Sequence, residues 1–148
     1  RGIPHGEGVV PDLDVLPHPR QERVPMILAG NGRQSPDWIA AQMQGRFVYP
    51  GSPERLAMQV ADWRGHREAL GLDRGVFISA LHLDLDAAPD APFQPFRFGG
   101  RAGRHALIAH LRGMATAGLD HLALLLRPSR RPVDAVLDEL AQHVLPAV

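Results

Sequence analysis

The residues with the clearest chemical potential form one glycine-containing turn, Gly30-Asn31-Gly32-Arg33-Gln34-Ser35. Its two glycines let the backbone approach a ligand closely, because glycine has no side chain to keep it away. Ser35 can cap a helix that has Pro36 at its first position, and the amides and dipole of such a helix favour a phosphate. Gln34 adds a side-chain donor and Arg33 adds positive charge. The turn indicates a phosphate site, but a lone Gly-x-Gly is equally typical of an ordinary strand-to-helix turn.

Eight histidines raise the question of a metal site. His105 and His110 are five residues apart, so they do not share a helix face. His82 and Asp84 share one face of a strand near its end, where we favour a hydrogen-bonded pair in a barrel interior over a ligand contact. The chain has no cysteine, which excludes disulfides, thiolate nucleophiles and cysteine metal sites. We therefore predict no metal.

Candidate nucleophiles and cations give no catalytic group that can be named. The serines occupy cap positions (Ser35, Ser52), a strand (Ser79) and a turn (Ser129), and no Gly-x-Ser-x-Gly elbow occurs. Six arginines fall in loops of the face where a ligand is expected: Arg97, Arg101, Arg104, Arg127, Arg130 and Arg131. They would bind an anionic substrate or, as we favour for most of them, carry solvated charge or make subunit contacts.

The elements that would position these groups alternate between short apolar runs and helical stripes. The expected order is strand 24–29, helix 36–45, strand 47–49, helix 53–71, strand 76–85, helix 104–117, strand 121–126 and helix 132–146. We expect the first strand, Val24–Ala29, to be buried on both faces. A long loop, Asp86–Gly100, follows the third strand, and loops of this length are usually functional or disordered.

This alternation predicts an α/β fold with a parallel sheet covered by helices. Two architectures fit: an open doubly wound sheet, or part of a closed (β/α)8 barrel. A complete barrel needs eight such units and about 250 residues, whereas this chain has 148. We expect residues 1–23, rich in Gly, Pro and His, to form a loop or small hairpin that leads into the four units of residues 24–148.

Composition excludes several kinds of partner. A formal net charge of zero argues against nucleic acid and anionic membrane surfaces, because both bind clustered positive charge. No apolar run approaches the roughly 20 residues of a membrane helix. We expect a cytoplasmic protein with a small-molecule substrate, although the chain begins at Arg1, so the missing targeting signal proves little.

Six segments, in order along the chain, match the pattern of one known family. They are 24–30 (VPMILAG), 34–40 (QSPDWIA), 45–50 (GRFVYP), 106–111 (ALIAHL), 117–127 (AGLDHLALLLR) and 136–146 (VLDELAQHVLP). The set resembles the bacterial-luciferase-like flavin monooxygenases, with a strand ending in glycine, a helix bearing Trp-Ile-Ala, a strand ending in Tyr-Pro and a closing helix–strand–helix. Gln44 departs from the pattern, since the family usually has aspartate there.

The resemblance implies that the chain is the C-terminal half, strands five to eight, of a (β/α)8 barrel. It implies that the loop after strand five holds the flavin phosphate through Gly30, Asn31, Gly32, Gln34 and Ser35. The chain departs from the family at Asn31-Gly32-Arg33, where relatives often have small hydroxyl residues. The loop Asp86–Gly100 corresponds to a mobile lid that would shield a reactive flavin–oxygen adduct.

The implied activity is a luciferase-like monooxygenase reaction, in which reduced FMN activates O2 and oxygen is inserted into a small organic substrate. Two alternatives stay open: a hydride-transfer enzyme that uses a deazaflavin coenzyme, and a non-catalytic α/β domain that binds flavin or another phosphorylated ligand. The catalytic residues would lie in the first half of the barrel, and the full-length protein is expected to be a homodimer. The half alone is expected to dimerise or to be poorly soluble, because strands 24–29 and 121–126 would be unpaired edges.

Overall fold

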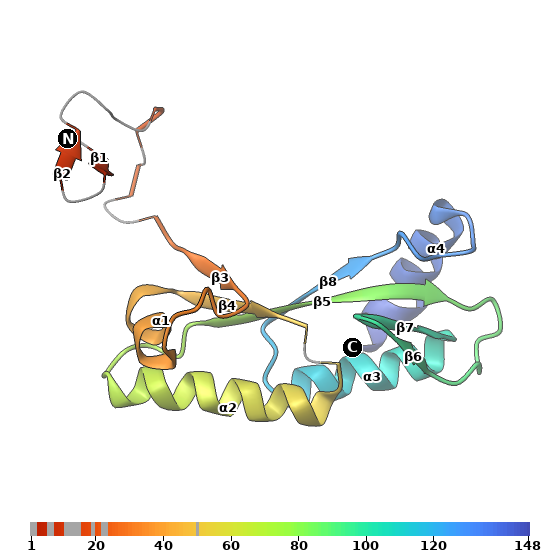
Figure 1. The fold of residues 1–148 in the computed structure, drawn as a ribbon. Coiled ribbons are helices and arrows are strands. Elements are labelled where there is room, and N and C mark those ends of the chain that lie inside the picture. The colour runs from red at the N-terminus through yellow and green to blue at the C-terminus, as the bar shows by residue number, and fades with distance from the viewer. Residues whose placement is uncertain (1–2, 6–7, 11–15, 19, 22–23, 50) are drawn as a thin grey trace.

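The computed structural model describes residues 3–5, 8–10, 16–18, 20–21, 24–49 and 51–148 (Figure 1). The strands are β1 (Ile3–His5), β2 (Gly8–Val10), β3 (Ile27–Ala29), β4 (Gly45–Val48), β5 (Val76–Leu85), β6 (Gln94–Phe96), β7 (Gly99–Ala102) and β8 (His121–Leu125). The helices are α1 (Pro36–Gln42), α2 (Pro53–Ala69), α3 (Arg104–Thr116) and α4 (Val133–Glu139), and two further turns, Leu140–Val144 and Leu145–Ala147, end the chain.

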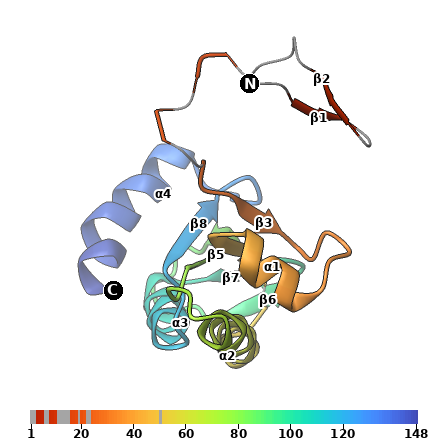
Figure 2. The same cartoon turned by 90° about the vertical axis from the view of Figure 1, so that its left-hand side faces the viewer.

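Four barrel strands of the main sheet are parallel, in the spatial order β3-β4-β5-β8, and the short β7 also pairs in parallel with the end of β5. Each is followed by a helix, and these helices cover one side of the curved sheet, as the end-on view in Figure 2 shows. The opposite side is concave. This is one half of a (β/α)8 barrel, so the structure decides between the two architectures that periodicity left open. The hairpin of β1 and β2 is drawn away from this sheet in both figures.

The helix starts follow from capping residues that the sequence identified. Ser35 Oγ accepts a hydrogen bond from Trp38 N at 3.2 Å, and Ser52 Oγ accepts one from Arg55 N at 3.3 Å. Both caps precede a proline at the first helical position, which has no N–H that would need a partner. The predicted starts of α1 and α2 are confirmed.

Two apolar cores lie between the sheet and the helices. Every second residue of β5 points to the helix side, from Phe77 to Leu85, and each of these is buried. Cluster one comprises Ile39, Ala40, Met43, Leu56, Val60, Trp63, Phe77 and Met114. Cluster two comprises Leu81, Leu83, Leu85, Ala102, Leu107, Val136, Leu140 and Val144. The remaining β5 residues face the concave side.

The expectation that strand 24–29 is buried on both faces is wrong. The strand is only Ile27–Ala29, and the Ile27 side chain is 48% exposed. Leu28 packs against the first core, but Ile27 and Ala29 lie on the concave side, which no described element covers. Among the described strands it pairs with β4 alone, and this position at the edge of the sheet explains the exposure.

The second strand begins earlier than predicted, and Gly45 belongs to it instead of ending the first helix. Helix α1 stops at Gln42, after which Gln44 N donates to Met26 O and the chain enters the sheet. A Cβ on Gly45 would lie 2.5 Å from Val76 Cγ2 and 2.8 Å from Val76 O. Glycine is needed here because β4 and β5 approach closely.

The expected long loop 86–100 is largely an ordered hairpin. Strands β6 and β7 pair in antiparallel fashion, and β7 adds to the C-terminal half of β5, with Gly99 opposite His82. A Cβ on Gly99 would lie 1.9 Å from His82 O, so only glycine allows this docking. Proline-rich composition concealed these strands, because such short pairings carry no alternating apolar pattern.

The last helix also differs from the expectation of one continuous helix over 132–146. It is α-helical over Val133–Glu139, π-helical over Leu140–Val144 and 3-10 over Leu145–Ala147.

Among the helices of the described residues, none combines the length and the apolar character that crossing a membrane requires.

Candidate functional site

Four loops meet at the end of the half-barrel where the parallel strands finish. They are residues 30–35 after β3, 49–52 after β4, 86–103 after β5 and 126–132 after β8. Residue 50 lies outside the described part of the chain. Ligands of barrels and of parallel α/β sheets bind at this end, because each loop there can be varied without disturbing the core.

The loop after β3 is a tight turn with consecutive left-handed residues. Gly30, Gly32 and Arg33 have φ values of 68°, 53° and 57°, and Arg33 is one of two described non-glycine residues with positive φ. Gly30 N donates to Phe47 O, and Gln34 N donates to Asn31 O. Within the described residues, the amides of Gly32 and Arg33 donate to no protein atom. Successive amides in such a turn can form a concavity that suits an anion.

The side chains predicted for this loop are partly engaged already. Asn31 Oδ1 accepts from Arg46 Nη2 at 2.8 Å, and the Ser35 hydroxyl oxygen accepts from Trp38 N. Asn31 and Gln34 line a polar pocket of about 220 Å³ on the helix side of β4, whereas Gly30, Gly32 and Ser35 do not line it. The structure therefore brings only two of the five predicted residues to one cavity.

That pocket also contains a cation and an amide with unused polar atoms. Arg46 Nε and Gln59 Oε1 are buried and have no hydrogen-bond partner among the described residues. Burial lowers the pKa of Arg46, while the neighbouring Asp62 carboxylate opposes that shift. Because unpaired buried polar atoms are costly, the pocket is suited to water or to a small polar group.

The concave side carries an aromatic cluster that the sequence analysis missed. Tyr49 follows β4, His82 lies on β5 and Phe98 lies in the β6–β7 turn. The ring centroids of Tyr49 and Phe98 are 4.7 Å apart, and His82 is 6.1 Å from Tyr49 and 6.0 Å from Phe98. The Arg97 guanidinium lies 4.8 Å from the Phe98 ring centre. These half-exposed rings are tilted at 44° to 86° to one another and form an amphipathic aromatic patch on the concave side.

One signal could have found part of this cluster. Phe47 and Ile78 are paired, so their side chains share the concave face, and the period of two carries that face to Tyr49 and to His82. Phe98 could not be found in this way, since the hairpin that carries it was not predicted and its φ of 66° is unusual for an aromatic residue.

His82 and Asp84 share the concave face as expected, but they do not form the expected pair with each other. Asp84 is 4% exposed. Its carboxylate accepts from Arg130 N at 3.1 Å and lies 3.2 Å from Arg130 Nε. The hydrogen-bonded partner of Asp84 is therefore the loop after β8, because that loop brings a main-chain donor and a cation to the strand end.

Most of the six loop arginines are used internally. Arg101 Nε donates to Asp86 Oδ2 at 2.7 Å, while Arg104 and Arg131 both pair with Glu139. A backbone hydrogen bond from Ala88 is the main reason why the pKa of Asp86 is lowered, and Arg101 adds to it. Arg97 and Arg127 make no ion pair with any described residue, so they are the cations left for an anionic ligand.

No group of three or more histidine, aspartate or glutamate side chains within the described residues could hold a metal ion. The site therefore consists of hydrogen-bonding groups, aromatic rings and arginines.

Sequence comparison finds neither a matching family model nor a matching curated protein. Structure comparison does find similar folds. An F420-dependent secondary alcohol dehydrogenase in complex with an F420-acetone adduct matches with a TM-score of 0.74 and 13% identity, over 100% of this chain and 56% of its own. The coenzyme F420-dependent tetrahydromethanopterin reductase from Methanopyrus kandleri matches with a TM-score of 0.63 and 10% identity, over 83% and 50%. DmoA from Hyphomicrobium sulfonivorans matches with a TM-score of 0.56 and 14% identity, over 78% and 39%.

These matches concern the fold, because all three identities are below 15%. The chain spans about half the length of the first two structures and less of the third. A half-length match to longer chains agrees with the half-barrel seen directly in the sheet order. The predicted fold class is thus confirmed.

Proposed function

We propose that this chain is the C-terminal half of an oxidoreductase barrel and that it binds the phosphate-bearing part of a flavin-like coenzyme at the loop after β3. The observation that carries the proposal is the pair of unused, left-handed amides at Gly32 and Arg33, directly after a barrel strand. Anions bind where adjacent amides point together at the end of a parallel strand.

The phosphate contacts that we propose differ from those implied by the sequence resemblance. The Asn31 and Ser35 oxygens already accept hydrogen bonds, so a phosphate would take the amides of Gly32 and Arg33 and the Arg33 guanidinium. The loop fits such a group because a Cβ on Gly30 would meet no atom within 4 Å, which leaves room above the turn. Gln34 and Asn31 would support the loop from the helix side.

The aromatic cluster would bind the ring system of the same coenzyme. Tyr49, His82 and Phe98 offer ring surface on the concave side, where they would orient a planar group and keep water from it. When bound, a flavin or deazaflavin supplies the electron or hydride transfer that no side chain can perform. The catalytic residues stay unassigned.

The two coenzyme classes can be ranked. A deazaflavin coenzyme is favoured because the names of two of the three similar structures specify coenzyme F420, one of them over the whole of this chain. The second candidate is a luciferase-like monooxygenase that uses reduced FMN and O2. It rests on the sequence resemblance. The substrate would be a small organic molecule in either case.

Binding can be tested by fluorescence titration with coenzyme F420, FMN and riboflavin, which lacks the phosphate. We expect F420 or FMN to bind at least tenfold more tightly than riboflavin. Arg33→Gly should remove most of that difference, because it deletes the guanidinium while tolerating the φ of 57°. Equal affinities for FMN and riboflavin, with F420 unbound, would contradict the proposal.

The matched control is Arg55→Gln, on the outside of the barrel. Arg55 is exposed in the first turn of α2. This variant removes one positive charge and should leave all three affinities unchanged. If it weakened binding as much as Arg33→Gly, the effect would be one of net charge and not of the turn.

A further inference from the structure

We infer that Arg46 is a positioning residue, which holds the loop after β3 in the shape that binds phosphate and does not touch the phosphate itself. The inference rests on the proposed function and names a residue on which the affinity of that site depends. Arg46 lies in β4 opposite Leu28 of β3, so its side chain lies on the helix side of the sheet. From there Arg46 Nη2 donates a hydrogen bond to Asn31 Oδ1 at 2.8 Å. This bond joins β4 to the turn that carries the proposed phosphate donors.

Asn31 is the residue that sets the direction of the turn. Its carbonyl oxygen accepts from Gln34 N at 2.9 Å, which closes a turn with Gly32 and Arg33 as its central residues. These two residues have φ values of 53° and 57°, and their amides are the proposed donors. A turn of this kind needs the left-handed conformation at both central positions. Because that conformation is unfavourable for arginine, contacts from outside the turn must hold it.

Two neighbouring side chains on the helix side supply such contacts. A Cβ on Gly32 would lie 3.3 Å from Leu28 Cδ1, so the backbone of the turn lies directly over Leu28. Leu28 packs against the first apolar core, which fixes its position. Arg46, its partner on β4, binds Asn31. The apolar contact sets only a distance, whereas the hydrogen bond also sets an orientation. The orientation of Asn31 therefore depends on Arg46.

The setting of Arg46 separates it from the phosphate. Its Nε is buried in the polar pocket, which the Asp62 carboxylate of α2 also lines. Burial opposes the charged guanidinium and Asp62 favours it. Neither Gly32 nor Arg33 lines this pocket. We therefore place the phosphate outside the pocket, in contact with Arg33 and not with Arg46.

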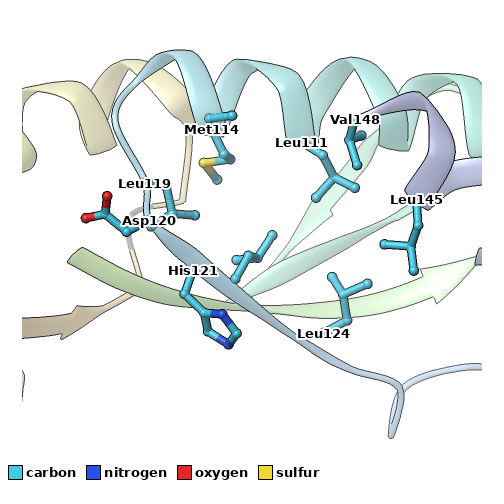
Figure 3. Close-up of a pocket in the computed structure, with 10 residues that line it drawn as sticks. Leu111, Met114, Leu119, Asp120, His121, Leu124, Leu145 and Val148 are labelled. Carbon is cyan, nitrogen blue, oxygen red and sulfur yellow. The ribbon is translucent and has the colours of Figure 1, made fainter. Parts of the chain in front are cut away.

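A second cavity, between α3, β8 and the final turn, has the opposite character (Figure 3). It has a volume of about 260 Å³, and most of its walls are leucine side chains. The Asp120 carboxylate points away from these leucines and accepts from Phe77 N at 2.8 Å. His121 pairs with Ile78 and so lies on the concave side, whereas Leu122 and Leu124 lie on the helix side. This cavity is unsuited to a phosphate, which needs hydrogen-bond donors.

Binding measurements on the full 148-residue chain test the role of Arg46. The phosphate preference is the ratio of the affinity for FMN to that for riboflavin, or of the affinity for coenzyme F420 to that for its deazaflavin without phosphate. Arg46→Met keeps the length of the side chain and removes its donors, and Asn31→Ala removes the acceptor without changing the charge. Each should lower the preference roughly threefold or more and leave the affinity for the phosphate-free ligand unchanged.

A double-mutant cycle shows whether the two residues act through one bond. The double variant should lose no more preference than the weaker of the two single variants, because both substitutions delete the same bond. Arg55→Gln, which removes an exposed charge from α2, should keep the full preference. A loss in Arg55→Gln as large as in Arg46→Met would show an effect of net charge and would overturn the inference.

Hydrogen exchange tests the loop without any coenzyme. The Gln34 amide is protected by its bond to Asn31 O, so Arg46→Met should speed its exchange roughly threefold or more. The Leu107 amide, which donates to Gly103 O at the start of α3, is the internal control and should exchange at the wild-type rate. Unchanged exchange of Gln34 in the folded variant would overturn the inference.

The outcomes distinguish a failure of this inference from a failure of the proposed function. A wild-type chain without any phosphate preference contradicts the proposed site, and Arg46 then has no phosphate loop to position. A wild-type chain with that preference, together with an Arg46→Met variant that keeps it, overturns the inference alone. The same holds if the effects of Arg46→Met and Asn31→Ala multiply, because the two residues would then act independently.

Discussion

Arg67 on α2 and Asp73 before β5 form an ion pair in which the cation is buried and the anion is exposed. Arg67 Nη2 donates to Asp73 Oδ1 at 2.7 Å, and the two side chains are 5% and 84% exposed. Arg67 Nη1 also donates to Ala40 O and Met43 O, each at 2.8 Å. The guanidinium thus satisfies carbonyls at the end of α1. Through these bonds Arg67 links α1, α2 and the segment that leads into β5.

The main value of Arg67 should therefore lie in its bonds to carbonyls and not in its ion pair. Arg67→Met leaves the buried oxygens of Ala40 and Met43 without a donor and should lower the free energy of unfolding by about 3 kcal/mol. Asp73→Asn should have only a small effect, because that carboxylate is in solvent. Urea unfolding measures both. Equal losses in the two variants would show that the ion pair dominates.

The pKa of Asp73 is lowered mainly by its hydrogen bond from Arg67, then by one from Gly75 N. A carboxyl with a lowered folded pKa stabilises the fold above its unfolded pKa, and this contribution is lost as the pH falls through the folded value. The difference between wild type and Asp73→Asn, small at neutral pH, should therefore vanish in acid. A difference that grew as the pH fell would contradict this sign.

Two glycine-to-alanine substitutions should have opposite signs. A Cβ on Gly99 would collide with the His82 backbone, so Gly99→Ala should detach the β6–β7 hairpin and destabilise the protein by more than about 2 kcal/mol. A Cβ on Gly65, within α2, meets nothing within 4 Å. Gly65→Ala should stabilise by about 0.5–1 kcal/mol through helix propensity. Thermal unfolding of the two variants checks this. A loss of stability in Gly65→Ala would contradict the open space that the structure shows around Gly65.

Asp84, near the end of β5, should matter more for stability than the exposed Asp90 in the loop that follows. Asp84→Asn keeps the volume but removes the negative charge facing Arg130 and Arg101, so we expect a loss of about 2 kcal/mol. Asp90, whose side chain is 86% exposed, pairs with His105 at the surface, and Asp90→Asn should change little. Chemical denaturation of both variants tests the contrast.

Sequence reasoning found what depends on local pattern. Ser35 and Ser52 were recognised as caps because each precedes a proline and a helical stripe, and strand 76–85 was recognised by its apolar alternation. Strand 24–29 was misjudged, because its apolar composition is that of a buried strand although its position at the sheet edge leaves it exposed. An apolar run does not reveal which neighbours the strand will have.

The site was harder to predict than the fold, because its residues are distant in the sequence and come together only when strands and loops pack in the fold. Asp84 contacts Arg130, 46 residues away, and nothing in the spacing of the two residues indicates that contact. Phe98 reaches Tyr49 only because β7 docks on β5 next to His82. By contrast, the glycine turn after β3 was visible as a local motif, and its left-handed residues have the conformation that such a motif needs.

His110 on α3 carries a pH dependence that can be read from its surroundings. Its ring stacks on Phe93 at 4.4 Å between centroids, and its Nε2 is buried without a partner in the described structure. Burial lowers the pKa of His110 below its ordinary value of 6.5, while the nearby Glu54 carboxylate opposes that shift. The folded state therefore prefers the neutral imidazole.

For a histidine with a lowered folded pKa, the stabilising contribution is present above the unfolded pKa and is lost as the pH falls through the folded value. His110→Phe keeps a ring against Phe93 and cannot be protonated, so its stability relative to wild type should rise steadily as the pH is lowered below about 6.5. His143→Gln, at an exposed histidine near the C-terminus, is the control for removal of a histidine as such. Melting temperatures between pH 7.5 and 5 distinguish the outcomes. Parallel profiles for His110→Phe and wild type would mean that His110 is not buried as a neutral ring.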